Sequence, residues 1–311
     1  MSLLDRYPDL DPEAAARIRE HGPHLEPMTG PLPAELLELA RAQGETPPPR
    51  EGISVRDAAV EGVPVWVYEH TAGTPTGILV YLHGGAFMVG SRLLMDGVAL
   101  KLALCTGASV VSVEYRLAPE HPYPAGLDDA ETVLRCALVE PGALGLGEGP
   151  VIVGGESAGG NLSAAVALRL RDRDGPRPAG QMLLYPGTDT FDADHPSRHL
   201  YDGLVLSRQG SKYIRSVYWA GRDLSDDPYA VPMAASDLNG LPPAFVMVGG
   251  CDWLRDEGLA YAARLGEAGV ETEVLTCAGQ PHAFLNLDFP AAADVYRAAG
   301  PWAQRILGGT N

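Results

Sequence analysis

Ser157 is the residue whose type and setting point most directly to chemistry. It stands between Gly155 and Gly159, in a turn that follows the apolar run 151–153 and precedes a helix-like stretch, 161–170. In such a turn from strand to helix, the two glycines let neighbouring backbone approach closely, and the serine hydroxyl projects over the edge of the sheet. The pattern therefore predicts a nucleophilic serine, with a purely structural glycine-rich turn as the alternative.

A serine hydroxyl becomes a strong nucleophile when an imidazole takes up its proton and a carboxylate orients that imidazole. Downstream of Ser157, Asp252 lies in the loop after the strand-like run 246–250, and His282 lies in the loop after the next predicted strand. Ligand and catalytic groups gather beyond the carboxyl ends of parallel strands, so we predict His282 as the base and Asp252 as the acid. Asp256 and Glu257 are alternative acids, but they begin the following helix, where the helix dipole makes acidic residues common.

A glycine-rich segment upstream of the serine, His-Gly-Gly-Ala-Phe at 83–87, follows a strand-like run. A loop of this kind presents backbone amides to the negatively charged oxygen of a tetrahedral intermediate. The amides predicted to hold that oxygen belong to Gly84, Gly85, Ala86 and, at the start of the helix after the serine, Ala158. We expect His83 to fix the loop by hydrogen bonding rather than to act as the base.

The other histidines and the four cysteines give no indication of a metal site. His195 and His199 stand in a polar mid-chain segment and His121 in a proline-rich loop, so we interpret all three as surface or packing residues. The histidines and cysteines form no set with both the number and the spacing of metal ligands. We therefore predict no metal and no cofactor, and we expect the cysteines, at 105, 136, 251 and 277, to be reduced packing residues.

The elements that must position these residues follow a regular rhythm of short apolar runs and helix-length segments. The runs are 78–82, 110–113, 151–153, 182–185 and 245–248. A predicted hairpin of 53–60 and 63–69 precedes them, and a helix at 255–268, a strand at 271–276 and a helix at 291–307 are predicted to follow. This alternation is typical of an α/β fold in which helices cover both faces of a parallel sheet.

Two parts of the chain depart from that rhythm. Amphipathic helices are predicted at 12–21 and 33–43, and a proline-rich connector at 46–50 separates them from the first strand. The segment between 186 and 227 is polar and too long for a plain loop. We therefore predict an N-terminal helical cap at 1–50, a catalytic domain at 51–311 and a second cap segment at 187–227.

Charge and hydropathy exclude several classes of partner. Lys and Arg number 23 against 40 Asp and Glu, and a net charge of −17 disfavours nucleic acid and anionic lipid. The longest weakly polar stretch, 77–90, is short for a bilayer span, and the first residues lack the basic start and apolar run of a secretory signal. We expect a cytoplasmic protein with no stable membrane insertion.

Several motifs, in this order along the chain, closely resemble the hormone-sensitive lipase family of esterases, bacterial family IV, within the α/β-hydrolase fold. They lie at 83–87, 115–125, 155–160, 184–186, 252–257 and 282–284. The resemblance implies a mostly parallel eight-stranded sheet with a helical cap, and a carboxylesterase that hydrolyses short- to medium-chain acyl esters. It also implies a Ser-His-Asp triad, an acyl-enzyme intermediate, an oxyanion hole and no cofactor. The segment 115–125 is expected to brace the site. The ligand would be a small-molecule ester, and the resemblance leaves a homodimer open.

Three positions depart from the family's usual pattern. Ala86 and Ala283 stand where the family usually has glycine, and Trp253 stands where it usually has proline. We expect these changes to alter the shape of the substrate rather than to abolish activity. Two other functions stay open: a specialised hydrolase or acyltransferase acting on a lactone, formamide, carbamate or O-acetyl metabolite, and a non-catalytic binding protein on the same fold. The presence of His282 counts against the second, because such proteins typically lack that residue.

Overall fold

A mixed sheet forms the centre of the computed structural model, which describes residues 2–21, 26–287 and 289–308. The eight strands of the described chain have the order β1-β2-β4-β3-β5-β6-β7-β8. β1 pairs antiparallel with β2, and β2 antiparallel with β4, whereas the other neighbours are parallel. The bounds are β1 Ile53–Val60, β2 Val63–His70, β3 Ile78–Leu82, β4 Ser109–Val113, β5 Val151–Glu156, β6 Gly180–Leu184, β7 Ala244–Gly249 and β8 Thr272–Cys277. The predicted α/β fold with its edge hairpin is confirmed.

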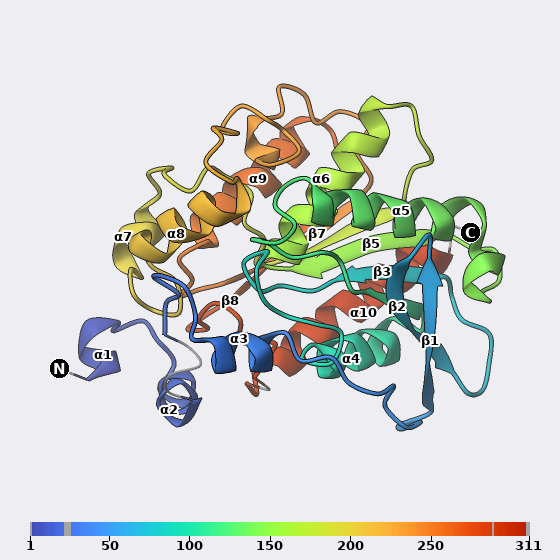
Figure 1. Ribbon diagram of the computed structural model, residues 1–311, viewed down its shortest axis with the longest axis horizontal. Helices are drawn as coiled ribbons and strands as arrows, with labels where there is room; N and C mark the ends of the chain where they lie inside the picture. Colours follow the sequence, from blue (N-terminus) through green and yellow to red (C-terminus); the bar gives the residue numbers. More distant parts are fainter. Residues whose placement is uncertain (1, 22–25, 288, 309–311) are drawn as a thin grey trace.

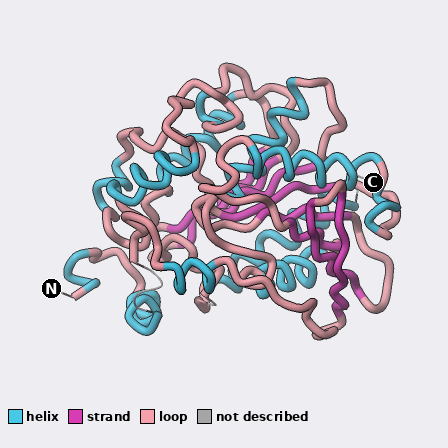
Figure 2. The backbone as a smooth tube through the Cα atoms, viewed as in Figure 1, coloured by secondary structure: helices cyan, strands magenta, loops and turns pink. Residues whose placement is uncertain are grey.

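Helices cover both faces of this sheet, as Figure 1 shows. The helices on one face are α5 (Ala125–Val139), α6 (Ala158–Asp172) and α9 (Arg255–Glu267), and those on the other are α4 (Asp96–Thr106) and α10 (Ala292–Gly308). The central strands are buried from both sides, and Figure 2 shows them enclosed by helices and loops. That double burial explains why they read in the sequence as continuous apolar runs rather than as alternating ones.

The strand β3 contributes side chains to the two hydrophobic clusters that lie on opposite faces of the sheet. Ile78, Val80 and Leu82 pack in the cluster that includes α5 and α6, whereas Leu79 and Tyr81 pack in the cluster that includes α4 and α10. Successive side chains of a strand point to opposite faces, so each apolar residue finds a covered face. The sheet is therefore a rigid base for the loops at its carboxyl edge.

The cap segments lie outside this sandwich. The N-terminal helices are α1 (Leu3–Arg6), α2 (Pro12–His21) and α3 (Ala34–Ala40), and the mid-chain segment carries α7 (Pro196–Leu200) and α8 (Arg208–Tyr218). In Figure 1, α1, α2, α7 and α8 lie at the same end of the molecule, and the Tyr7 hydroxyl donates a hydrogen bond of 2.9 Å to the carbonyl of Asp202. No described helix combines the length and the apolar character needed to cross a bilayer.

The helix α3 is shorter than the predicted 33–43. The carbonyl of Ala40 accepts a hydrogen bond of 2.8 Å from the amide of Gly90, and so ties the end of the helix to the glycine-rich loop. The next residue, Arg41, extends the same tie, because its Nε donates to the carbonyl of Met88 at 2.7 Å. A tertiary contact of this kind leaves no periodic signal in the sequence. The division into 1–50, 51–311 and 187–227 remains a prediction.

Candidate active site

The turn between β5 and α6 holds Ser157 in an unusual backbone conformation, with φ 57° and ψ −117°. Such conformations cost on the order of 1–3 kcal/mol and persist only where the surroundings enforce them. The two flanking glycines are required: a Cβ on Gly155 would lie 2.3 Å from the carbonyl oxygen of Leu82, and one on Gly159 only 1.9 Å from it. The close approach predicted for the glycines is therefore present, and it fixes Ser157 at the end of the strand.

The structure brings together the three residues predicted as a triad. Ser157 Oγ lies 2.8 Å from His282 Nε2, and His282 Nδ1 lies 2.8 Å from Asp252 Oδ2. Asp252 is completely buried, and the His282 ring is nearly so. With an ionised Asp252, Nδ1–H donates to the carboxylate, which leaves Nε2 free to accept the proton of the serine. The arrangement is chemically able to activate the hydroxyl.

Two loops that bind each other position the acid and the base. The amide of Cys251 donates to the carbonyl of Gln280 at 2.9 Å, and the amide of Gly250 donates to the carbonyl of Cys277 at 2.8 Å. The second oxygen of Asp252 accepts a hydrogen bond of 2.8 Å from the amide of Leu254. The carboxylate is thus held at both of its oxygens, one for the imidazole and one for the backbone.

The glycine-rich loop lies beside the serine, and its backbone is strained. Gly85, Ala86 and Phe87 all have positive φ, at 118°, 55° and 62°. Within the described ranges, the amides of Gly85, Ala86 and Ala158 donate to no backbone carbonyl, which leaves them available to a ligand. Both Ala86 and Ala158 line the same cavity as Ser157. Gly84 is placed differently from the other three, because its α-carbon packs against the carboxyl of Glu156.

His83 and Tyr115 support this loop. The imidazole Nδ1 of His83 lies 2.7 Å from the carbonyl of Gly84, and the ring stacks on Tyr115 with centroids 4.3 Å apart. The Tyr115 hydroxyl donates to the carbonyl of His83 at 2.6 Å. These contacts agree with the structural part expected of His83 and with the bracing expected of the segment 115–125.

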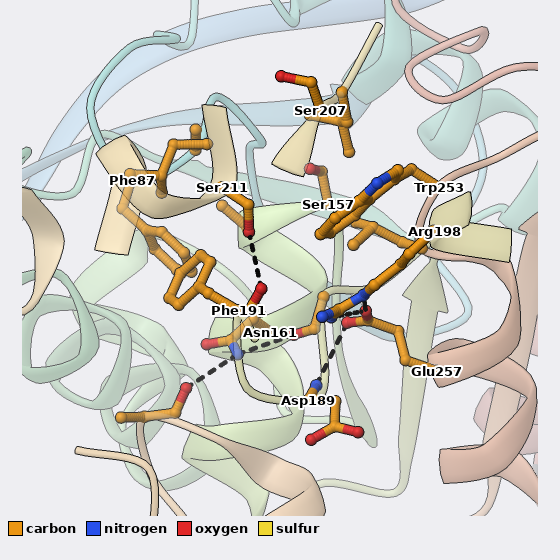
Figure 3. Close-up of a pocket in the computed structure, with 17 residues that line it drawn as sticks. Phe87, Ser157, Asn161, Asp189, Phe191, Arg198, Ser207, Ser211, Trp253 and Glu257 are labelled. Carbon is orange, nitrogen blue, oxygen red and sulfur yellow. Dashed lines mark hydrogen bonds and ion pairs between the residues drawn. The ribbon is translucent and has the colours of Figure 1, made fainter. Parts of the chain in front are cut away.

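A small cavity of about 70 Å³ opens beside Ser157. Its walls are largely apolar, and three aromatic rings stand out among them, those of Phe87, Phe191 and Trp253. Figure 3 shows Trp253 on one side of Ser157, with Phe87 and Phe191 on the other. Asn161 is one of the polar lining residues, and its side chain donates to the carbonyls of Gly187 and Ala230.

The positions that depart from the family pattern have structural consequences. Trp253 and Ala86 both line the cavity, so both can shape what enters it. Ala86 and Ala283 have φ of 55° and 62°, in the left-handed region that glycine adopts without strain. The alanines therefore occupy backbone conformations that suit the glycine usually found there.

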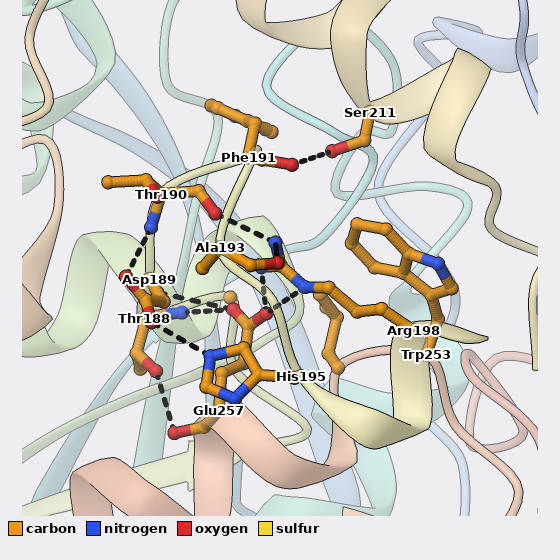
Figure 4. Close-up of polar contacts among 12 residues, drawn as sticks. Thr188, Asp189, Thr190, Phe191, Ala193, His195, Arg198, Ser211, Trp253 and Glu257 are labelled. Carbon is orange, nitrogen blue, oxygen red and sulfur yellow. Dashed lines mark hydrogen bonds and ion pairs between the residues drawn. The ribbon is translucent and has the colours of Figure 1, made fainter. Parts of the chain in front are cut away.

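Sequence reasoning missed a buried ion pair on the floor of the cavity. Arg198 lies between Trp253 and Glu257, with its guanidinium carbon 4.3 Å from the centroid of the Trp253 ring. Its Nε donates to Glu257 at 3.1 Å and Nη2 donates to the same carboxylate, while Nη1 donates to the carbonyls of Thr190 and Ala193, each at 2.8 Å. Figure 4 shows how these bonds tie the mid-chain segment to the start of α9. Arg198 and Glu257 are 59 residues apart in the sequence, so no local pattern indicated that they form a pair.

The two alternative acids are occupied elsewhere. Glu257 also accepts the amide of Thr188 at 2.8 Å. Asp256 accepts the amide of Ser197 at 2.7 Å and a guanidinium hydrogen bond from Arg255. Neither carboxylate is bonded to His282, whose Nδ1 faces Asp252.

The mid-chain histidines bind carboxylates of their own segment. His195 Nε2 lies 2.8 Å from Asp189 and His199 Nε2 lies 2.5 Å from Asp194. His121 is exposed. In the ranges that the structure describes, no group of three or more His, Cys, Asp or Glu side chains has an arrangement that could hold a metal ion.

Comparisons with known proteins converge on one fold. A family model described as "alpha/beta hydrolase fold" matches residues 79–286. Carboxylesterase NlhH of Mycobacterium tuberculosis is 39% identical over 277 residues, which is 84% of this chain and 86% of the relative. Carboxylic ester hydrolase LipN of the same species is 38% identical over 255 residues, 78% of this chain and 67% of the relative. Among solved structures, DphMB1 superposes with a TM-score of 0.84 at 36% identity and covers 97% of this chain and 99% of its own.

Proposed function

The chain belongs to the alpha/beta hydrolase fold family, in its hormone-sensitive-lipase-like branch, and on that premise we propose that it is a serine carboxylesterase acting through Ser157. The observation that carries the proposal is the unbroken chain of contacts from Ser157 Oγ through His282 to Asp252, with two distances of 2.8 Å. Ser157 also lines the largely apolar cavity, where an ester group can meet its hydroxyl.

The proposed reaction has two halves. His282 Nε2 takes the proton of Ser157 as Oγ attacks the ester carbonyl carbon, and the carbonyl oxygen becomes an oxyanion. As the intermediate collapses, His282 gives the proton to the departing alcohol, and an acyl group remains on Ser157. Water, deprotonated by the same imidazole, then attacks the acyl-enzyme and releases the carboxylic acid.

The amides of Gly85, Ala86 and Ala158 are the donors that we assign to the oxyanion. They have no backbone acceptor of their own among the described residues, and Ala86 and Ala158 line the same cavity as Ser157. Preorganised amides of this kind stabilise developing charge more than water does, because they need no reorganisation. The sequence also suggested Gly84 for this role, but its contact with Glu156 points to a supporting part instead.

The cavity supports short acyl esters as preferred substrates. Its small volume of about 70 Å³ and its aromatic walls favour a short acyl group over a long extended chain. The Phe87 ring lies against Tyr218 with centroids 3.7 Å apart, so that wall is rigid. We therefore expect kcat/KM to peak among the short p-nitrophenyl esters and to decline toward palmitate.

A panel of p-nitrophenyl esters from acetate to palmitate, assayed with the wild type and with Ser157→Ala, tests this function. The expected result is hydrolysis of the short esters and a loss of about 10⁴-fold or more in kcat for the variant. Ordinary turnover by Ser157→Ala would refute the nucleophile. Maximal turnover on palmitate would refute the chain-length preference but leave the nucleophile standing.

A further inference from the structure

Glu156, the residue immediately before the nucleophile, is a buried carboxyl that the proposed reaction does not use. Its side chain has an exposed fraction of 0%. Among the described residues its Oε1 accepts a hydrogen bond from the Tyr81 hydroxyl, and its Oε2 is buried without a hydrogen-bond partner. A fully buried carboxyl without a cation is costly in its ionised form, so its place behind the active site needs an explanation.

This carboxyl touches two loops of the active site at once. On the side of the glycine-rich loop, a Cβ built on Gly84 would lie only 2.1 Å from Glu156 Oε2, so the glycine packs directly on the carboxyl. On the side of the base, Asn286 stands four residues after His282 and accepts a hydrogen bond of 3.3 Å from the Tyr185 hydroxyl. Its side chain is close enough to Glu156 to lower the pKa of that carboxyl. From the sheet, the Tyr81 hydroxyl donates to Oε1 at 3.3 Å.

The groups around Glu156 favour its neutral form. Burial raises the pKa of Glu156 to about 8, and the nearby polar groups of Gly84, Tyr81 and Asn286 offset only part of that effect. Burial also raises the pKa values of the neighbouring hydroxyls of Tyr81, Tyr115 and Tyr185, and it lowers the pKa of His83, so these neighbours are uncharged near neutral pH. Tyr296 on α10 faces the same tyrosine cluster. Charged groups act on two of these neighbours: Glu114 and Arg92 on His83, and Asp252 on Tyr185.

We propose that Glu156 is a positioning residue. As an uncharged carboxyl it keeps two loops in their places behind Ser157: the glycine-rich loop, at Gly84, and the loop that carries His282, at Asn286. The proposal rests on the esterase function. An ionised Glu156 would place a negative charge directly behind the loop whose amides must stabilise an oxyanion. The reaction is therefore expected to slow as this carboxyl loses its proton.

The pH dependence of kcat distinguishes this role from a purely structural one. With p-nitrophenyl acetate and correction for spontaneous hydrolysis, wild-type kcat is expected to fall above about pH 8, by up to about tenfold per pH unit. Glu156→Gln, which keeps the shape of the side chain and cannot ionise, is expected to show no such fall. Glu131→Gln is the matched control: Glu131 is a buried glutamate paired with Arg135 on α5, and its variant should keep the wild-type profile.

A second variant guards against a folding failure of Glu156→Gln. Asn286→Ala removes a polar group that lowers the pKa of Glu156. The alkaline fall in kcat should therefore move to higher pH, while KM changes little. Superimposable profiles of wild type and Glu156→Gln, or an alkaline fall that Asn286→Ala does not move, would overturn the proposal. A wild type that hydrolyses no ester at any pH would instead count against the proposed function itself.

Discussion

Removal of Arg198 should destabilise the protein far more than removal of an ordinary surface arginine. The side chains of Arg198 and Glu257 are only 2% and 1% exposed. Arg198→Met would leave Glu257 as a buried charge and would also remove the guanidinium hydrogen bonds to the carbonyls of Thr190 and Ala193. Removing one partner of a buried ion pair typically lowers the free energy of unfolding by about 3–5 kcal/mol. We expect a loss of that size in the free energy of unfolding, a large share of the roughly 5–15 kcal/mol that folded proteins usually have.

The pH dependence of this loss follows from Glu257. Burial raises the pKa of its carboxyl, and the guanidinium of Arg198 acts in the opposite direction. Without Arg198 the folded-state pKa rises further above the unfolded value, so the folded state binds the extra proton at low pH and loses stability as pH rises. The cost of Arg198→Met should therefore be smaller at about pH 5 than at about pH 8.

Urea unfolding followed by tryptophan fluorescence measures both effects. Arg297→Met is the matched control, because Arg297 forms an ion pair with Asp294 but is 74% exposed, and exposed pairs contribute about 0–1 kcal/mol. The double variant Arg198→Met with Glu257→Gln removes the stranded charge and should recover part of the loss. A cost below about 1 kcal/mol for Arg198→Met, or a cost that grows toward acid pH, would refute the reasoning.

Three further predictions concern the site. Ala86→Gly and Ala283→Gly should each raise the free energy of unfolding by up to about 1 kcal/mol, because glycine relieves the left-handed backbone; unchanged ester preference in both variants would refute the idea that these alanines shape the substrate. Tyr115→Phe removes the 2.6 Å hydrogen bond to the His83 carbonyl and should cost about 1–3 kcal/mol in thermal or urea unfolding, with a lower kcat. Asp252→Asn should lower kcat on p-nitrophenyl acetate by about 10⁴-fold with little change in KM, since it disturbs the tautomer of the imidazole; a loss below about tenfold would contradict the role of the acid.

The parts of the molecule that local patterns encode could be predicted from the sequence. The central strands appear as apolar runs because both sheet faces are covered, and Ser157 and Asp252 each follow such a run. His282 follows the edge strand β8, which is largely exposed and was predicted from its place after the helix 255–268. Chain order and strand ends were enough to bring them to one edge. The packing of Gly84 against Glu156 left no such pattern, because it depends on how two strands stand beside each other.

Contacts between distant segments could not be read in the same way. The pair of Arg198 and Glu257 depends on how the mid-chain segment folds back on α9, and neither residue carries a local signature of burial. The end of α3 at Ala40 depends on the amide of Gly90, fifty positions away. Charged residues usually signal a surface, so a buried arginine stacked on Trp253 reverses the ordinary expectation.

The central claim is that Ser157 is a nucleophile activated by His282, and covalent labelling tests it most directly. The protein is treated with a fluorophosphonate and its intact mass and peptide map are recorded, with Ser157→Ala and His282→Ala in parallel. We predict one adduct per chain, located on Ser157, absent from the first variant and formed much more slowly in the second. An adduct on another residue, or equal labelling of the wild type and His282→Ala, would contradict the claim.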